Sequence, residues 1–267
     1  MQFLPKLNFV YSFNLAEALP HFHIYPERTK AAAERYVAEV IYESFVVTGD
    51  QDYLMARLLA LKGLPRGFYW AAAQTVEKYL KALLLMRGQG VVSYRGHPLL
   101  NLLKAATSVE PSLRTVDISM HQSIRAPENY SSLLQQFTVN ELLIDLENHG
   151  ASDNRYNAIG IEYNTGHMFA LDTFAHHVRA LIGVLPIGES HRKLSEDLVA
   201  SFNIANPWFC FSQEPSLILP TKELPLKAHG TVTRLEFISK NQGSPECTIA
   251  MEWLSEKMQL PKSLRKK

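Results

Sequence analysis

The amino-acid sequence predicts a mostly α-helical protein: an up-and-down helical bundle with an N-terminal helical extension and an irregular C-terminal appendage. Along most of residues 26–185, apolar residues recur at the three-and-four spacing of helices. Proline and glycine punctuate this pattern where helices are expected to begin and end. After Pro186 the helical period fades, so short strands or extended segments are expected there.

The strongest helical pattern lies between Gly67 and Gly88 and predicts a helix of about five turns. Its buried stripe is expected at Tyr69, Ala72, Ala73, Val76, Leu80, Leu83 and Leu84. Three adjacent alanines near its start would let a neighbouring helix approach closely. On its polar side, Gln74, Lys78 and Lys81 share one stripe, and a glutamate four residues before Lys81 can pair with that lysine.

Two helices are expected before this central one. Pro26 opens the first, which should end near Gly49, and Asp50 is then the expected N-cap of the second. Gly63 ends the second helix. Because so short a connection follows, the second helix and the central helix should pack antiparallel.

Further elements are expected later in the chain. Pro98 opens a helix with His97 near its N-cap and a buried stripe at Leu99, Leu102, Leu103 and Ala106. Helices are also expected over residues 131–148 and from Gly166 to about Gly183. In the C-terminal part, the sequence pattern indicates short strands or extended segments at residues 216–220, 231–239 and 247–253.

Composition narrows the classes of function. Lys and Arg number 27 against 26 Asp and Glu, so a formal net charge of +1 gives no global attraction to nucleic acid or membrane. We expect no signal peptide and no membrane span, because charged and polar residues interrupt every apolar run. Two cysteines form no disulfide framework, and a reducing cytoplasm fits best. We expect no metal site and no cofactor.

Three pieces of sequence occur in an order that resembles the HEPN family, the higher eukaryote and prokaryote nucleotide-binding domain. The first is Tyr-Leu-Met-Ala-Arg-Leu-Leu at residues 53–59, and the second is an alanine-rich helix with a Gln-x-x-Glu-Lys-x-x-Lys-Ala core at residues 74–82. The third is Gly-His-Pro-Leu-Leu at residues 96–100. Arg155 and Tyr156 also resemble the arginine-tyrosine turn before that family's final helix. The resemblance covers residues 50–185.

The resemblance implies an α-helical bundle that usually dimerises, and together with the segments on either side of it the sequence predicts a three-part chain. Residues 1–49 would form an arm and helix on the bundle, residues 50–185 the HEPN-like bundle, and residues 186–267 a C-terminal extension. Members of the family fall into three functional groups. Some are metal-independent endoribonucleases, some are inactive partners of a nucleotidyltransferase or antitoxin, and others bind nucleotides or RNA.

Nuclease members use an arginine and a histidine, four to six residues apart, near the start of the final helix. Histidine would move a proton while arginine stabilises charge on the phosphate. Arg114 and His121 have six residues between them and fit this spacing, although their sequence context differs from the family's. Arg155 and His167 flank the expected place but are separated by eleven residues, which departs from the pattern.

A ligand site without catalysis would use Gln74, Lys78, Lys81, His97, Arg155 and Tyr156. Lysines on a helix and a histidine at a helix N-terminus can hold phosphate oxygens. An equally simple interpretation is that Lys81 pairs with Glu77, Lys78 is solvated and His97 only caps its helix.

The sequence thus supports three hypotheses about function. The first is a cytoplasmic HEPN-like protein that binds a nucleotide or RNA in a stress or defence (toxin–antitoxin-like) system. The second is a metal-independent endoribonuclease toxin that uses one of the two Arg/His pairs. The third is a non-catalytic dimerisation scaffold or a partner of a nucleotidyltransferase.

Overall fold

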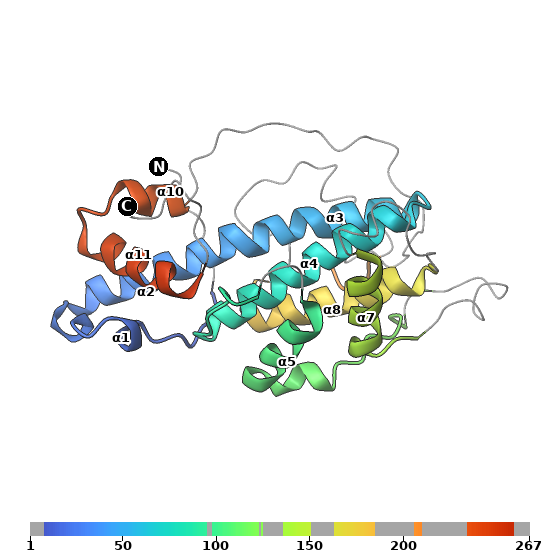
Figure 1. Ribbon diagram of the computed structural model, residues 1–267, viewed down its shortest axis with the longest axis horizontal. Helices are drawn as coiled ribbons and strands as arrows, with labels where there is room; N and C mark the ends of the chain where they lie inside the picture. Colours follow the sequence, from blue (N-terminus) through green and yellow to red (C-terminus); the bar gives the residue numbers. More distant parts are fainter. Residues whose placement is uncertain are drawn as a thin grey trace.

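The structure is a computed structural model that describes residues 8–94, 98–122, 124, 136–150, 163–184, 206–209 and 234–258, with the backbone alone of Leu61 and Glu236. The elements in these ranges are helical, and no strand occurs in them, which confirms the all-α class (Figure 1). The elements are α1 (Leu15–Ala18), η1 (Phe22–Ile24), α2 (Glu27–Ile41), η2 (Tyr42–Val46), α3 (Val47–Leu61), α4 (Pro65–Met86), α5 (Leu99–Val109), η3 (Pro111–Arg114), α7 (Val139–Gly150), α8 (Gly166–Ile182), α10 (Arg234–Lys240) and α11 (Pro245–Lys257).

Helix α4 is the central element of the bundle. It packs against α3 along the long axis of the molecule, and α5, α7 and α8 also contact it (Figure 1). Its apolar stripe is buried as the sequence predicts, because every position expected to face inward is at most 1% exposed. The predicted stripe of α5 is likewise buried. Pro65, at the first helical position, and the left-handed Gly88 delimit α4.

The prediction that a helix ends at Gly49 is wrong. The chain stays helical from α2 through the π-helical turn η2 into α3, and forms one long rod in Figure 1. Gly49 lies inside α3, where a Cβ would come within 2.7 Å of the Tyr79 ring on α4. Glycine at this position therefore permits close helix packing, and does not end the helix. Asp50 is no N-cap, because its carboxylate lies buried between α3 and α8.

Two buried ion pairs fix α8 against α3. Arg57 Nη1 of α3 donates to Asp172 Oδ2 of α8 at 2.6 Å, with both side chains at most 2% exposed. In the second pair the direction is reversed: Arg179 of α8 donates to Asp50 of α3, and Tyr79 of α4 adds a hydrogen bond at 2.5 Å. Buried charges require such partners, because each would otherwise lose its hydration without compensation.

The N-terminal and C-terminal elements pack against each other around α2, at one end of the long rod. Helix α11 packs on α2 and α1, and α10 packs on α2 and α11 (Figure 1). Trp253 of α11 is 1% exposed and contacts the Phe13 ring, with ring centroids 5.1 Å apart. Arg234 of α10 pairs with Glu39 of α2 at 2.7 Å.

Two of the three segments expected to be strands are helical. Residues 234–239 of the segment 231–239 lie in α10, and residues 247–253 lie in α11. In α11, Pro245 stands at the first helical turn, and the buried residues Cys247, Ala250, Met251 and Leu254 recur at helical spacing. The remaining segment, 216–220, lies outside the described residues.

The close contact between α3 and α4 predicts the effect of a small substitution. In Gly49→Ala the added methyl group must displace the Tyr79 ring, whose hydroxyl is held by Asp50, so the overpacking should cost about 2–3 kcal/mol. Alanine gains roughly 1 kcal/mol in helix propensity, so the free energy of unfolding should fall by about 1–2 kcal/mol in total. Urea unfolding measures the difference.

Gly243→Ala is the matched control for this substitution, because a Cβ there meets no atom within 4 Å. It should change the free energy of unfolding by less than about 0.5 kcal/mol. If Gly49→Ala cost no more than Gly243→Ala, the tight contact between α3 and α4 would be refuted.

Candidate functional site

The polar stripe of α4 is engaged by neighbouring carboxylates. Lys81 donates to Glu77 at 2.5 Å, the pairing expected from its spacing. Lys78 donates to Asp52 of α3, also at 2.5 Å. The alternative interpretation of the sequence left Lys78 solvated, whereas in the structure it is paired. Gln74 lies on the same helix and is half-buried. Each lysine is therefore already held by a carboxylate, with which a bound phosphate would have to compete or share the ammonium group.

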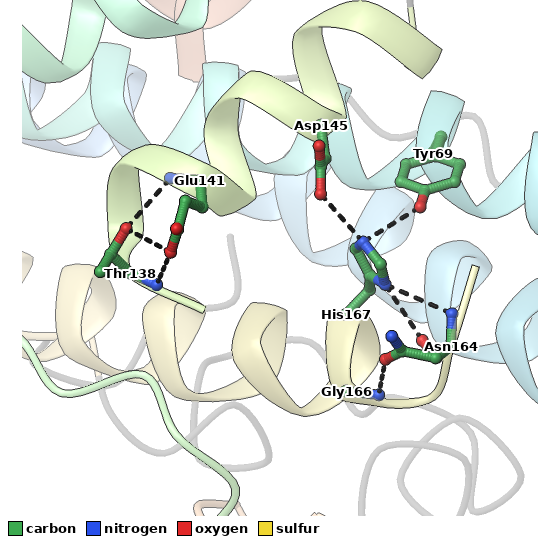
Figure 2. A network of polar contacts seen from close by, with 7 residues as sticks. All are labelled: Tyr69, Thr138, Glu141, Asp145, Asn164, Gly166 and His167. Atoms are coloured by element: carbon green, nitrogen blue, oxygen red, sulfur yellow. Dashed lines mark hydrogen bonds and ion pairs between the residues drawn. The ribbon is translucent and has the colours of Figure 1, made fainter. Parts of the chain in front are cut away.

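His167, the histidine at the start of α8, lies inside the bundle and is 3% exposed (Figure 2). Its Nε2 lies 3.1 Å from the Tyr69 hydroxyl and 3.2 Å from Asp145 Oδ2. Its Nδ1 lies 3.2 Å from the carbonyl oxygen of Asn164. Burial lowers the pKa of His167, and the hydrogen bond to Asp145 opposes this effect. His167 therefore links α4, α7 and α8.

Three of the predicted site residues, His97, Arg155 and Tyr156, lie outside the described residues. The other predicted pair, Arg114 and His121, lies in the segment that leaves η3. Arg114 is exposed at the end of η3, and His121 is half-buried farther along. His121 lines a cavity, which makes this segment the strongest candidate for a functional site among the described residues.

The cavity has a volume of about 670 Å³ and lies between the segment 112–122, the end of α8 and Trp208. This volume falls within the range that small-molecule sites usually have. Its lining combines polar and apolar groups: Ser112, Thr115, Val116, Asp117, Ser119, Met120, His121, Gln122, His177, Ala180, Leu181 and Trp208.

Three histidines surround Trp208. The ring centroids of His121, His176 and His177 lie 4.9, 4.7 and 5.6 Å from that of Trp208. The indole Nε1 donates to Thr173 Oγ1 of α8 at 2.8 Å, which fixes the orientation of the ring. An aromatic ring, two lining imidazoles and several hydroxyl groups thus face one cavity.

The charges of the cavity follow from its hydrogen bonds and burial. Hydrogen bonds from the hydroxyl and backbone N–H of Ser119 lower the pKa of Asp117, so this carboxylate is ionised at neutral pH. Burial lowers the pKa of His177, and the nearby Asp117 partly offsets this. His177 is therefore mostly neutral at pH 7 and can accept a proton or a hydrogen bond.

Sequence reasoning singled out His121 but missed Asp117, Thr173 and Trp208. The adjacent His176 and His177 of α8 both contact Trp208, which lies outside their helix. No local sequence pattern predicts this site, because the residues that line it come from segments far apart in the chain.

The part of the chain that the structure describes contains neither a candidate metal-binding group nor a candidate membrane-spanning helix. There, no three His, Cys, Asp or Glu side chains form a group that could hold a metal ion. Nor is any helix in the described ranges both long and apolar enough to cross a membrane.

Comparison of the chain with protein-family models, with curated proteins and with solved structures finds no match. The resemblance to the HEPN family is therefore a resemblance of sequence motifs alone, which these comparisons do not test.

His176 provides a pH-dependent prediction. Its pKa is lowered to about 4, first by burial and then by repulsion from the positive charges that His177, Arg179 and His121 carry when they are protonated. The unfolded chain, with a histidine pKa near 6.5, therefore takes up this proton before the folded chain does. His176 contributes stability above about pH 6.5, and this contribution is lost as the pH falls towards about 4.

Titration of the imidazole resonances by NMR measures this pKa, with His176→Gln to assign the signal. The resonance of His176 should shift with a midpoint near pH 4. A midpoint near 6.5, the ordinary histidine value, would contradict the described burial of His176 between α8 and Trp208.

Proposed function

We propose that this chain is a HEPN-like protein that binds a nucleotide or a segment of RNA in the cavity beside Trp208. The observation that carries the proposal is that His121, His177 and Trp208 line one cavity of about 670 Å³. Aromatic rings stack on nucleic-acid bases of any sequence. Imidazoles can donate hydrogen bonds to phosphate oxygens, and these bonds strengthen when the donor is charged.

The arrangement gives each part of a nucleotide a partner. The base would stack near Trp208, and a phosphate would lie near His121, on the segment that also carries the exposed Arg114. Asp117 repels phosphate, because its carboxylate is ionised. It would instead accept hydrogen bonds from ribose hydroxyls or from an amino group of the base.

The wider proposal keeps the setting that the family resemblance implies. We place the protein in a stress or defence system in the cytoplasm, as a homodimer or beside a nucleotidyltransferase or antitoxin. The packing of the alanine-rich α4 against α3 and α5 supports the resemblance, because α3 and α4 carry the first two motifs and α5 begins with the last two residues of the third.

Binding is tested by calorimetric titration of the protein with AMP and with a short single-stranded RNA. We expect saturable binding to the wild type, and an affinity about tenfold to a hundredfold lower for His121→Ala, since it removes a hydrogen bond to a charged phosphate that is worth roughly 1.5–3 kcal/mol. Arg114→Gln should weaken binding of the RNA in the same direction.

His23→Ala serves as the matched control, because His23 is an exposed histidine in η1 and does not line the cavity. Its affinity should equal that of the wild type. Absence of saturable binding for both probes would reject this function and leave the dimerisation scaffold.

A second candidate is metal-independent cleavage of RNA, favoured by two histidines on one cavity. His177, being mostly neutral, would take the proton of a ribose 2′-OH as it attacks the phosphorus, and His121 would protonate the departing 5′-oxygen. The products would be a 2′,3′-cyclic phosphate and a 5′-hydroxyl.

Incubation of the wild-type protein with RNA in EDTA tests this candidate. Cleavage should occur, and His121→Gln or His177→Gln should each lower its rate by about 10²–10⁴-fold, the usual contribution of a general acid or base. His23→Gln should cleave like the wild type, and RNA with 2′-O-methyl groups should stay intact. RNA that remains whole at high protein concentration would rule out the nuclease.

A further inference from the structure

Residues 206–209 dock onto the bundle through side chains that reach its core. Asn206 is fully buried, and its Nδ2 donates to the Tyr53 hydroxyl of α3 at 2.7 Å. Trp208 Nε1 donates to Thr173 Oγ1 of α8 at 2.8 Å. Phe209, which is 6% exposed, packs against Tyr53 with ring centroids 5.8 Å apart. The segment is thus held by α3 and α8 together.

The buried ion pair between Arg57 and Asp172 sets the direction of the Tyr53 hydroxyl group. The hydroxyl donates its proton to Asp172, which is itself paired with Arg57. Burial, with the charge of Asp172, raises the pKa of Tyr53 well above 10, so this proton stays in place. Because the proton points at Asp172, the lone pairs of the oxygen are left to accept the Asn206 amide.

These contacts place Trp208 as one wall of the cavity. We propose that Tyr53, Thr173 and Asn206 are positioning residues for the site: they hold the Trp208 ring where a ligand base would stack. This inference rests on the function proposed above. It extends the site inward from the cavity to the Arg57–Asp172 pair, whose charges orient Tyr53.

The bundle contains a second network that provides a matched control. Tyr79 of α4, like Tyr53, is fully buried and donates its hydroxyl to an aspartate paired with an arginine, here Asp50 and Arg179. The remaining hydrogen bond described for this network joins Arg179 to the backbone oxygen of Val184. The hydrogen bonds described for Tyr79 and its partners therefore do not run to residues 206–209.

The experiment compares Tyr53→Phe with Tyr79→Phe in the full chain. Each removes one buried hydroxyl, so each should lower the urea midpoint of unfolding. Only Tyr53→Phe should shift the indole N–H resonance of Trp208 in an NMR spectrum recorded without ligand, with Trp208→Phe used to assign the signal. Tyr53→Phe should also weaken AMP binding about tenfold, whereas Tyr79→Phe should leave it unchanged within about twofold.

Thr173→Val keeps the test decisive if Tyr53→Phe fails to fold. This change preserves the branched shape of the side chain but removes the acceptor of the indole proton. The Trp208 N–H should then exchange with solvent faster than in the wild type, and AMP should bind about tenfold more weakly.

Two results would overturn the inference. One is a Trp208 resonance that neither Tyr53→Phe nor Thr173→Val alters. The other is an equal shift in Tyr53→Phe and Tyr79→Phe, since this would mean a general loss of packing. If instead the wild type bound neither AMP nor RNA while Tyr53→Phe alone moved the resonance, the placement of Trp208 would stand and the proposed ligand would be wrong.

Discussion

Two arginine–aspartate pairs buried between α3 and α8 are the interaction on which the rest of the bundle depends. Each pair removes two charges from water, which costs more than hydrophobic packing of the same volume would. In return, α8 can lie on α3 in one register only, because any shift along either helix would leave a charge without its partner. The two pairs have opposite polarity, since α3 supplies an arginine to one and an aspartate to the other. This arrangement also selects one direction of the two helices.

Helix α4 supplies what these ion pairs cannot, namely close apolar contact with several neighbours. On one side Gly49 of α3 lies against the Tyr79 ring, and on another Gly150 of α7 lies so close that a Cβ would come within 2.7 Å of the Tyr69 carbonyl oxygen. Where helices approach to this distance, small residues are required on at least one of them. Tyr79 also joins the apolar and ionic parts of the core, because its ring packs at Gly49 while its hydroxyl binds Asp50.

The repeating patterns in the sequence allowed the buried faces of α4 and α5 to be predicted, because burial of a helix face leaves a period of 3.6 residues. Local rules failed where a residue serves a distant partner. Asp50 has the chemistry of an N-cap, yet its partner is Arg179, and Lys78 finds Asp52 on another helix. The Arg114 and His121 pair was chosen by spacing, and His121 does line the cavity. Trp208 could not be found in this way, since only the folded chain brings it to α8.

The packing of α11 on α2 has a consequence for how the protein is made. Helix α2 leaves the ribosome well before α11, the helix that covers it, because most of the described elements lie between them in the chain. Until then, the apolar side of α2 that will meet α11 has no native cover, although α3, α4 and α8 can already assemble with one another. The nascent chain therefore passes through a stage in which this apolar surface is exposed to chaperones or to other unfinished chains.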